Sequence, residues 1–493
     1  MAVRTRAAQG GRGSLPLWVG AGVLVAAVVV IVVVLVSGAE TIDPFAYQPS
    51  KRAQFEARAA MGESHLLYAD SPGGAPATAR RVAALQAPIQ AAAAGAHVDP
   101  GLLEAIVFLE SAGRSEVVAG SDPAAAAGVT QIVAETGRSL LGMHIDLRAS
   151  RRLTKQIAAA QKRHDSGFVA RLQAQRRRVD DRFDPNKAIA ATGRYLAYAL
   201  PRFGRTDFAI ASYHMGIGNL ADVIRGYVGP KEKRLAIKIV RERKLTYAQL
   251  YFDSTPFRHK TAYRRLAQLG DNSNTYYWRV LAARDIMRRY RQDAAQLDQL
   301  NGLETGYGSA EAVLRPPGST EVFANAGALR RARRQKVLVR VPNQAKQRHF
   351  AVDPAVLAQA RQLSGDPAFS AALRSQALAL LYYLANRVHA ITHTSAPLLV
   401  GSTVRDGVYQ QALVQRRLAP PGYSVYTTGY SFDIKRRYAS QSQANAFQAM
   451  LDRLQALNVI AWERRADVIH ITASDQAKPL TPLLHGAQLA ADS

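Results

Sequence analysis

A single glutamate at the end of an apolar segment is the strongest candidate for chemistry in this sequence. The segment is HVDPGLLEAIVFLESAG, residues 97–113, and the glutamate is Glu110. Asp99 followed by Pro100 predicts that a helix begins here, because aspartate caps helix N-termini and proline suits the first helical position. Residues seven apart lie on one side of a helix, which puts Glu110 on the same apolar side as Leu103.

Such surroundings change the acidity of a carboxyl group. Burial against apolar side chains disfavours the charged form and raises the pKa towards the value that a general acid needs near neutral pH. The sequence therefore predicts Glu110 as a catalytic acid/base. The alternative is a structural glutamate that bonds a neighbour at the helix end.

Two further segments, GSDPAAAAGVTQIVAET (120–136) and DPNKAIAATGRYLAYALPRFGRTDFAIASYHMGIGNL (184–220), extend the pattern. Together with Glu110-Ser111 they resemble the SLT-type lytic transglycosylases, which have a goose-lysozyme-like fold. In that family a helix ends in Glu-Ser, a turn leads into Gly-Leu-Met-Gln-Ile, and a later helix ends in Ala-Tyr-Asn-Ala-Gly. Residues 128–132 and 212–216 correspond to the second and third motifs, and TYYWRVLAARDIMRRY (275–290) resembles the closing helix.

The resemblance implies a mechanism with one acid, whereas ordinary glycosidases use two carboxylates. Glu110 would protonate the oxygen between N-acetylmuramic acid (MurNAc) and N-acetylglucosamine (GlcNAc), while the muramic N-acetyl group stabilises the developing cation. The Glu110 carboxylate would then take the proton of the 6-hydroxyl, so that a 1,6-anhydro ring closes without water. This domain would need no cofactor.

The resemblance also implies substrate contacts. Tyr213 would hydrogen-bond and orient Glu110, and Gln131 and the turn at Gly128 would contact the sugar N-acetyl group. Alternatively, Tyr213 is an ordinary buried tyrosine and Gln131 caps the turn. The implied substrate-binding residues of this domain are Ser111, Gly128, Gln131, Tyr213, His214 and Gly216.

The sequence departs from the family pattern at three places. His214 stands where asparagine is common, Val129-Thr130 replaces Leu-Met, and Ala125 replaces a glycine. These departures concern the glycan contacts and the rate, not the acid.

A second resemblance lies near the C-terminus, in GSTVRDGVYQQALV (401–414), GYSVYTTGYSFDI (422–434) and ADVIHIT (466–472). These segments resemble the zinc D-Ala-D-Ala carboxypeptidases. The resemblance implies Asp433 and His470 as metal ligands, with Arg405 near the substrate.

The implied zinc site departs from that family in its ligands. Tyr426 stands where the first histidine ligand should be, and Asp467 stands in the place of the catalytic glutamate. Catalytic zinc needs three good protein ligands, so the sequence favours a degenerate module that holds wall peptide. The alternatives are a scaffold, or a working zinc peptidase whose site is completed by a residue such as His389 or His393.

The predicted fold class is multidomain: an N-terminal transmembrane helix, a mainly-α lysozyme-like domain with helical apolar spacing, and a smaller α+β domain of the D-Ala-D-Ala carboxypeptidase type. In the last of these, a helix over 354–390 precedes short β-like runs and a second helix at 441–457. The predicted boundaries are a cytoplasmic tail at 1–16, the transmembrane helix at 17–37, a juxtamembrane spacer at 38–84, the SLT-like domain at 85–298, a linker at 299–345, the carboxypeptidase-like domain at 346–480 and a tail at 481–493.

The transmembrane prediction rests on residues 17–36, which carry no charge and match the ~20 residues needed to cross a bilayer. Three arginines precede them and two acidic residues follow, so the positive-inside rule leaves the N-terminus in the cytoplasm and exports the rest. The expected location is the cell membrane, with a single span. A cleaved signal peptide is the alternative, although its apolar region is usually shorter.

Charge and cysteine content narrow the partners. The chain has no cysteine, which excludes disulfides and thiolate metal sites, and its net charge of +27 favours anionic partners. Export argues against nucleic acid and for peptidoglycan glycan strands, with stem peptides and anionic wall polymers as further candidates. Residues 148–182 hold eleven Lys/Arg against three Asp, which indicates a helical insertion that is either a solvated face or a contact for anionic polymer.

The predicted function is that of a membrane-anchored peptidoglycan lytic transglycosylase that acts through Glu110. The alternatives are a non-catalytic peptidoglycan-binding scaffold, or a zinc peptidase that acts on stem peptides through the C-terminal region.

Overall fold

The computed structural model describes residues 43–269, 272–305, 310–342, 348–364 and 371–484. The chain divides into two compact units, Met1–Ala46 and Tyr47–Ser493. In the described part of the first unit, the Ala46 N–H donates to the Asp43 carbonyl. The predicted tail and transmembrane segment at 1–37 lie outside the described residues. Among the helices that are described, none is both long and apolar enough to span a membrane.

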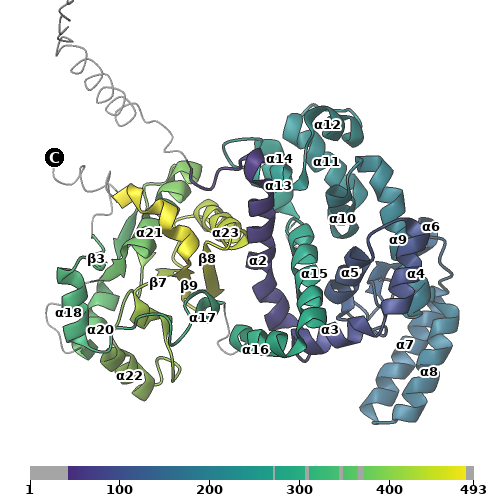
Figure 1. Ribbon diagram of the computed structural model, residues 1–493, viewed down its shortest axis with the longest axis horizontal. Helices are drawn as coiled ribbons and strands as arrows, with labels where there is room; N and C mark the ends of the chain where they lie inside the picture. Colours follow the sequence, from purple (N-terminus) through teal and green to yellow (C-terminus); the bar gives the residue numbers. More distant parts are fainter. Residues whose placement is uncertain (1–42, 270–271, 306–309, 343–347, 365–370, 485–493) are drawn as a thin grey trace, which may run out of the picture. The chain divides into compact units, whose positions relative to one another are not determined.

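The first part of the second unit is almost entirely helical (Figure 1). One short hairpin of β1 (Ala126–Ala127) and β2 (Ile132–Val133) interrupts the helices. The helices are α2 (Arg52–Asp70), α3 (Ala75–Ala83), α4 (Gln86–Ala96), α5 (Pro100–Ser111), α6 (Ala134–Ser139), α7 (Leu147–Lys162), α8 (Ser166–Val179), α9 (Pro185–Phe203), α10 (Thr206–Met215), α11 (Ile217–Val228), α12 (Ala236–Arg243), α13 (Tyr247–Asp253), α14 (Lys260–Gln268), α15 (Tyr276–Gln292) and α16 (Ala294–Thr305).

Helix α15 organises this helical part, because it packs against α2, α3, α5, α10 and α16. Its Trp278 is fully buried, with its ring among those of Tyr247, Tyr251 and Phe252. Burial of large aromatic side chains contributes much of the energy of a core. The segment that resembles a family's closing helix therefore fixes the position of α5, which carries Glu110.

The prediction of a spacer at 38–84 is wrong from residue 52 onwards, where α2 and α3 form and pack against α15. The buried side of α2 includes Gly62 and Glu63 beside apolar residues, which weakens the hydrophobic pattern in the sequence. Gly62 permits close packing, since a Cβ there would lie 2.0 Å from the carbonyl oxygen of Gln455. A glycine in a buried helix face gives no apolar signal even though it marks a tight contact.

The linker predicted at 299–345 is also folded over the residues that the structure describes. It contains the end of α16, α17 (Glu311–Leu314), α18 (Ala326–Arg334) and β3 (Leu338–Arg340). Phe323 and Leu338 lie in one apolar cluster with Ala372 and Val404 from the later part of the chain. Glycine and proline in this segment shape turns within a folded region and do not mark a flexible connection.

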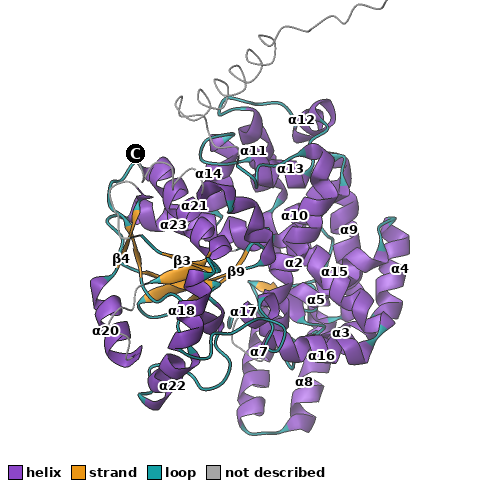
Figure 2. Ribbon diagram, turned by 60° about the vertical axis from the view of Figure 1, so that its left-hand side comes forward, coloured by secondary structure: helices purple, strands orange, loops and turns teal. Residues whose placement is uncertain are grey.

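The remaining elements form two sheets with flanking helices (Figure 2). A five-stranded sheet has the order β4-β6-β7-β9-β8, in which β4 and β6 are parallel and the other neighbours antiparallel; β3 pairs with β5. The helix predicted over 354–390 is two helices separated by β5. The bounds are β4 (Phe350–Val352), α20 (Pro354–Ser364), β5 (Ala372–Arg374), α21 (Ser375–Thr392), β6 (Leu398–Val400), α22 (Gly407–Gln415), β7 (Ser431–Lys435), α23 (Gln441–Ala456), β8 (Ile460–Arg464) and β9 (Val468–Ala473).

Candidate active site

Glu110 lies in the last turn of α5, a helix that begins where the sequence indicates. The Asp99 side chain accepts a hydrogen bond from the Gly101 amide at 2.8 Å and caps the helix. The residue Glu110 is half-buried, and burial of its carboxyl group raises the pKa to about 7 against the opposing effects of Tyr276 and Arg279. A carboxyl group with this pKa is present in both protonation states near neutral pH, as an acid/base catalyst requires.

Tyr276, not Tyr213, makes the hydrogen bond to Glu110. The Tyr276 hydroxyl donates to Glu110 Oε1 at 2.7 Å from the first turn of α15. The Tyr213 hydroxyl instead donates to the Thr130 carbonyl at 2.8 Å and lies 3.1 Å from Thr192 Oγ1. The resemblance implied that Tyr213 bonds and orients Glu110, but Tyr276 does so in the structure. The sequence did not point to Tyr276.

The rings of three residues stack next to Glu110. The Tyr213 and Tyr276 centroids are 6.3 Å apart with an interplanar angle of 17°, and those of His214 and Tyr276 are 5.1 Å apart at 24°. His214 is exposed, and its Nδ1 lies 2.8 Å from Ser273 Oγ. Gly216, at φ 84°, then joins α10 to α11. Tyr213 and His214 thus pack against the ring of Tyr276, and Tyr276 makes the hydrogen bond to Glu110.

Replacing each tyrosine by phenylalanine separates their roles. Tyr276→Phe removes the hydrogen bond that lowers the pKa of Glu110, so we expect the alkaline limb of the pH–rate profile to move to higher pH and the rate to fall about tenfold. Tyr213→Phe is the matched control, since its hydroxyl bonds Thr130 and Thr192, and its alkaline limb should stay in place. A shifted limb in Tyr213→Phe alone would contradict this assignment.

The turn between β1 and β2 packs on the C-terminal end of α5. Ser111 is buried, and its hydroxyl donates to the Val129 carbonyl at 2.7 Å, so it ties α5 to the turn and does not face a substrate. The Gln131 amide nitrogen donates to the carbonyls of Gly128 at 2.8 Å and Val117 at 3.2 Å. Gln131 therefore caps the turn, which is the structural alternative considered for it.

Gly128 is required at its position for two reasons. Its φ of 80° lies in the left-handed region, and an added Cβ would lie 1.8 Å from the Arg182 carbonyl oxygen. The 120–136 segment can approach residue 182 this closely only with glycine. The sequence-predicted residues Gly128 and Gln131 therefore belong to one turn, and Ser111 at the end of α5 bonds that turn.

Gly128→Ala is expected to destabilise the protein by about 2–3 kcal/mol, because left-handed backbone and displacement of main chain both cost energy. Gly142→Ala is the control: Gly142 has φ 62° but nothing within 4 Å of an added Cβ. It should lose only the ~1–2 kcal/mol of left-handed strain. Urea unfolding of both variants tests this, and equal losses would show that the contact with Arg182 is unimportant.

Arg182 anchors the turn from the far end of the basic segment 148–182. Its guanidinium is fully buried, pairs with Asp180 at 2.7 Å, and donates to the carbonyls of Pro123, Ala125 and Ile132. Arg176 is also buried and pairs with Glu116 at 2.7 Å. The segment is helical, as predicted. These two arginines are buried, however, so they contribute neither to a solvated face nor to a contact for anionic polymer.

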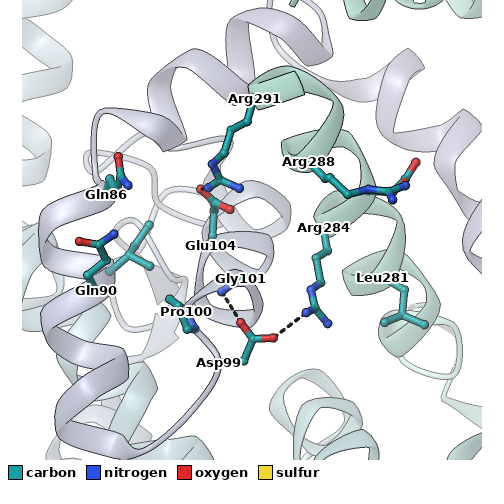
Figure 3. A pocket seen from close by; sticks show the side chains of 12 residues that line it. Gln86, Gln90, Asp99, Pro100, Gly101, Glu104, Leu281, Arg284, Arg288 and Arg291 are labelled. Carbon is teal, nitrogen blue, oxygen red and sulfur yellow. Dashed lines mark hydrogen bonds and ion pairs between the residues drawn. The ribbon is translucent and has the colours of Figure 1, made fainter. Parts of the chain in front are cut away.

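A cavity of about 590 Å³ lies at the opposite end of α5 and does not include Glu110 (Figure 3). Arginines of α15 line one side, and acidic residues of α5 and its cap face them. Arg284 pairs with Asp99 at 2.6 Å, and Arg291 pairs with the buried Glu104. The cavity is therefore separate from the candidate active site.

In the C-terminal region, the structure brings Tyr426, Asp433 and His470 together in a closed network. The Tyr426 hydroxyl donates to Asp433 Oδ1 at 2.5 Å, and His470 Nδ1 lies 3.0 Å from the same oxygen. Glu311 of α17 closes the other side, with Oε2 2.5 Å from His470 Nε2. Arg405 lies over the Tyr426 ring at 3.7 Å and donates to Gln410.

This network does not fit a zinc ion. Burial raises the pKa of Tyr426 well above its ordinary range, so the phenol stays neutral. Burial lowers the pKa of His470, but hydrogen bonds and charges from Asp433 and Glu311 outweigh it and raise the pKa, which favours an imidazolium without a free lone pair. The prediction of Asp433 and His470 as metal ligands is therefore not supported, because the two residues pair with each other.

Of the two histidines proposed as replacement ligands, His389 has other partners. His389 stacks on His349 with ring centroids 3.6 Å apart, and its Nδ1 lies 2.7 Å from the Thr394 carbonyl. His393 ends α21 in a left-handed conformation. Within the described ranges, no group of three or more His, Cys, Asp or Glu side chains is placed to hold a metal ion.

Residues 87–236 match the family described as Transglycosylase SLT domain. A comparison with curated proteins gave no match. The matched region contains Glu110, the turn at 128–132 and the 212–216 motif, whereas Tyr276 lies beyond it. The chain thus contains a transglycosylase SLT domain at residues 87–236, which supports a lytic transglycosylase acting on peptidoglycan glycan strands.

Proposed function

We propose that the protein is a membrane-anchored lytic transglycosylase that cleaves the β-1,4 bond between MurNAc and GlcNAc and leaves a 1,6-anhydroMurNAc end. The observation that carries the proposal is Glu110, a half-buried acid with a pKa of about 7 in an SLT domain. Its hydrogen-bond partner is a neutral tyrosine, Tyr276. No second carboxylate is needed for the reaction proposed.

The reaction has two proton transfers through one group. Protonated Glu110 donates its proton to the glycosidic oxygen as the C1–O bond breaks, and GlcNAc leaves with the new hydroxyl. The muramic N-acetyl oxygen stabilises the charge at C1. The Glu110 carboxylate then takes the proton of the 6-hydroxyl as the C1–O6 bond forms, which restores the acid. The Tyr276 hydroxyl stabilises the carboxylate between these steps, because it donates to it.

Digestion of purified peptidoglycan by the full chain, with mass analysis of soluble products, tests the proposal. Anhydro ends, lighter than hydrolysed ends by one water, are the expected result. Hydrolysed ends would indicate a lysozyme-type hydrolase. Binding without any product would favour the non-catalytic peptidoglycan-binding scaffold.

We further propose that residues 17–36 anchor the protein in the cell membrane with its folded region outside the cytoplasm. Support comes from the uncharged sequence and from the arginines that precede it. Membrane fractionation combined with N-terminal sequencing of the mature protein tests this. A shortened N-terminus in the soluble fraction would indicate a cleaved signal peptide instead.

For the C-terminal region we propose a degenerate carboxypeptidase-like module that holds wall peptide without a metal. The full chain is expected to retain no stoichiometric zinc after equilibrium dialysis, because Tyr426 is neutral and His470 is paired on both ring nitrogens. Tyr426→His combined with Glu311→Ala supplies a second imidazole and frees His470, and this variant should gain zinc. One zinc per wild-type chain would overturn the proposal and favour the zinc peptidase.

A further inference from the structure

Helix α7 carries a row of cations on its solvent side. Arg148, Arg151, Arg152, Lys155 and Lys162 are all exposed, and we call them the α7 basic stripe. The other four stand three, four, seven and fourteen residues after Arg148, so all five lie along one side of the helix. At 1.5 Å per residue the stripe is roughly 21 Å long.

The opposite side of α7 is covered. Leu153, Ile157 and Ala160 pack with Leu172 of α8, and together they hold the α7–α8 hairpin that extends from the other helices (Figure 1). No aromatic residue occurs in α7. Helix α7 therefore offers a ligand positive charge, but neither an apolar surface nor an aromatic ring on which a base could stack.

Among the residues that the structure describes, most of the charge of the stripe is not neutralised. Arg151 pairs with Asp122 at 2.9 Å, whereas the other four cations form no ion pair with any residue that the structure describes. Helix α7 itself contains no acidic residue. A row of like charges without counter-charges raises the local concentration of anions, and so favours an anionic ligand.

The stripe is continuous with the turn of the candidate active site. Asp122, the partner of Arg151, belongs to the loop that leads into β1, and Arg151 with the Ala124 amide lowers the pKa of Asp122 to about 2. At the base of the hairpin, Arg182 holds the same loop through the carbonyls of Pro123 and Ala125. A polymer that lies against this turn is thereby brought beside the stripe.

We propose that the α7 basic stripe binds the carboxylates of peptides carried by the same glycan strand whose sugars occupy the Glu110 site. The stripe then makes the protein selective for peptide-bearing over bare glycan. This inference rests on the proposed function. Peptide carboxylates fit better than a lipid surface, because α7 has no free apolar side to insert. They fit better than nucleic acid, because single-strand binding relies on aromatic stacking.

Binding of the full chain carrying Glu110→Gln tests the proposal without turnover. Two substrates are compared: intact peptidoglycan, and peptidoglycan from which an amidase has removed the peptides. We expect about tenfold tighter binding of the intact form at low salt, since several weak exposed ion pairs act together, and loss of the difference at high salt. Adding Arg152→Gln, Lys155→Gln and Lys162→Gln should abolish the preference but leave binding of bare glycan unchanged.

The matched control neutralises three exposed cations elsewhere, with Lys233→Gln, Lys238→Gln and Arg243→Gln. It should keep the preference. The proposal would be overturned if the chain bound both substrates equally, or if the control variant lost the preference to the same extent. It would also be overturned if the chain bound phosphatidylglycerol vesicles or oligothymidylate more tightly than intact peptidoglycan. Failure of the proposed function has a different readout, namely the absence of anhydro ends after digestion by the wild-type chain.

Discussion

Glu110→Gln is expected to lower the rate of peptidoglycan cleavage by about 10³–10⁴-fold, while the protein still folds and binds the polymer. General acid catalysis contributes roughly 10²–10⁴-fold, and Glu110 would serve as both acid and base. Glutamine keeps the shape of the side chain and can still bond the Tyr276 hydroxyl, but it cannot donate and recover a proton. The measurement is the release of anhydro ends by the full chain under matched conditions.

The control for this variant is Glu104→Gln. Glu104 lies on the same helix and is buried, but it pairs with Arg291 near the separate cavity. It should affect stability and leave the active-site chemistry intact per folded molecule. If Glu110→Gln retained more than about a tenth of the wild-type rate, Glu110 could not be the general acid, because general acid catalysis contributes roughly 10²–10⁴-fold to the rate.

The pH dependence has a definite sign. The first step needs protonated Glu110, whose pKa is raised from 4.5 to about 7, so the rate should fall as pH rises above 7. The same shift affects folding. A carboxyl group with a raised pKa in the folded state contributes stability below pH 4.5 that is lost as pH rises through about 7. Glu110→Gln should therefore be relatively more stable than wild type above pH 7, measured as Tm against pH.

Arg182→Met is expected to destabilise the protein by about 3–5 kcal/mol, because it leaves the buried Asp180 carboxylate without its partner. Three carbonyls of the turn also lose their donor. Since Gln131 and Gly128 belong to this turn, activity should fall even under conditions where the variant is folded. Urea unfolding and cleavage assays at low temperature measure the two effects.

Two comparisons identify the cause. Arg182→Met combined with Asp180→Asn removes both charges and should recover much of the lost stability, because the cost arises from the unpaired charge. Arg151→Met removes an exposed arginine that pairs with Asp122, and it should change stability little. A double variant no more stable than the single one would mean that the carbonyl contacts, not the ion pair, carry the effect.

The sequence by itself determined the start of α5, the apolar surroundings of Glu110 and the order of the three motifs. Each of these depends on residues close in the chain: a cap beside a proline, apolar residues at helical spacing, and a glycine turn before glutamine. The SLT match at 87–236 covers these motifs. The mainly helical character of this domain was predicted for the same reason, because apolar residues recur at helical spacing along the chain.

Only the tertiary structure decided which residues complete the site. Tyr276 bonds Glu110 from 166 residues away, and nothing in the run Tyr276-Tyr277-Trp278 distinguishes the ring that faces the acid. Likewise, Arg182 looks like any other residue of a basic segment, yet it is fully buried because Asp180 and three carbonyls satisfy its guanidinium. Whether a charge is buried depends on partners brought together by folding, and local periodicity does not contain that information.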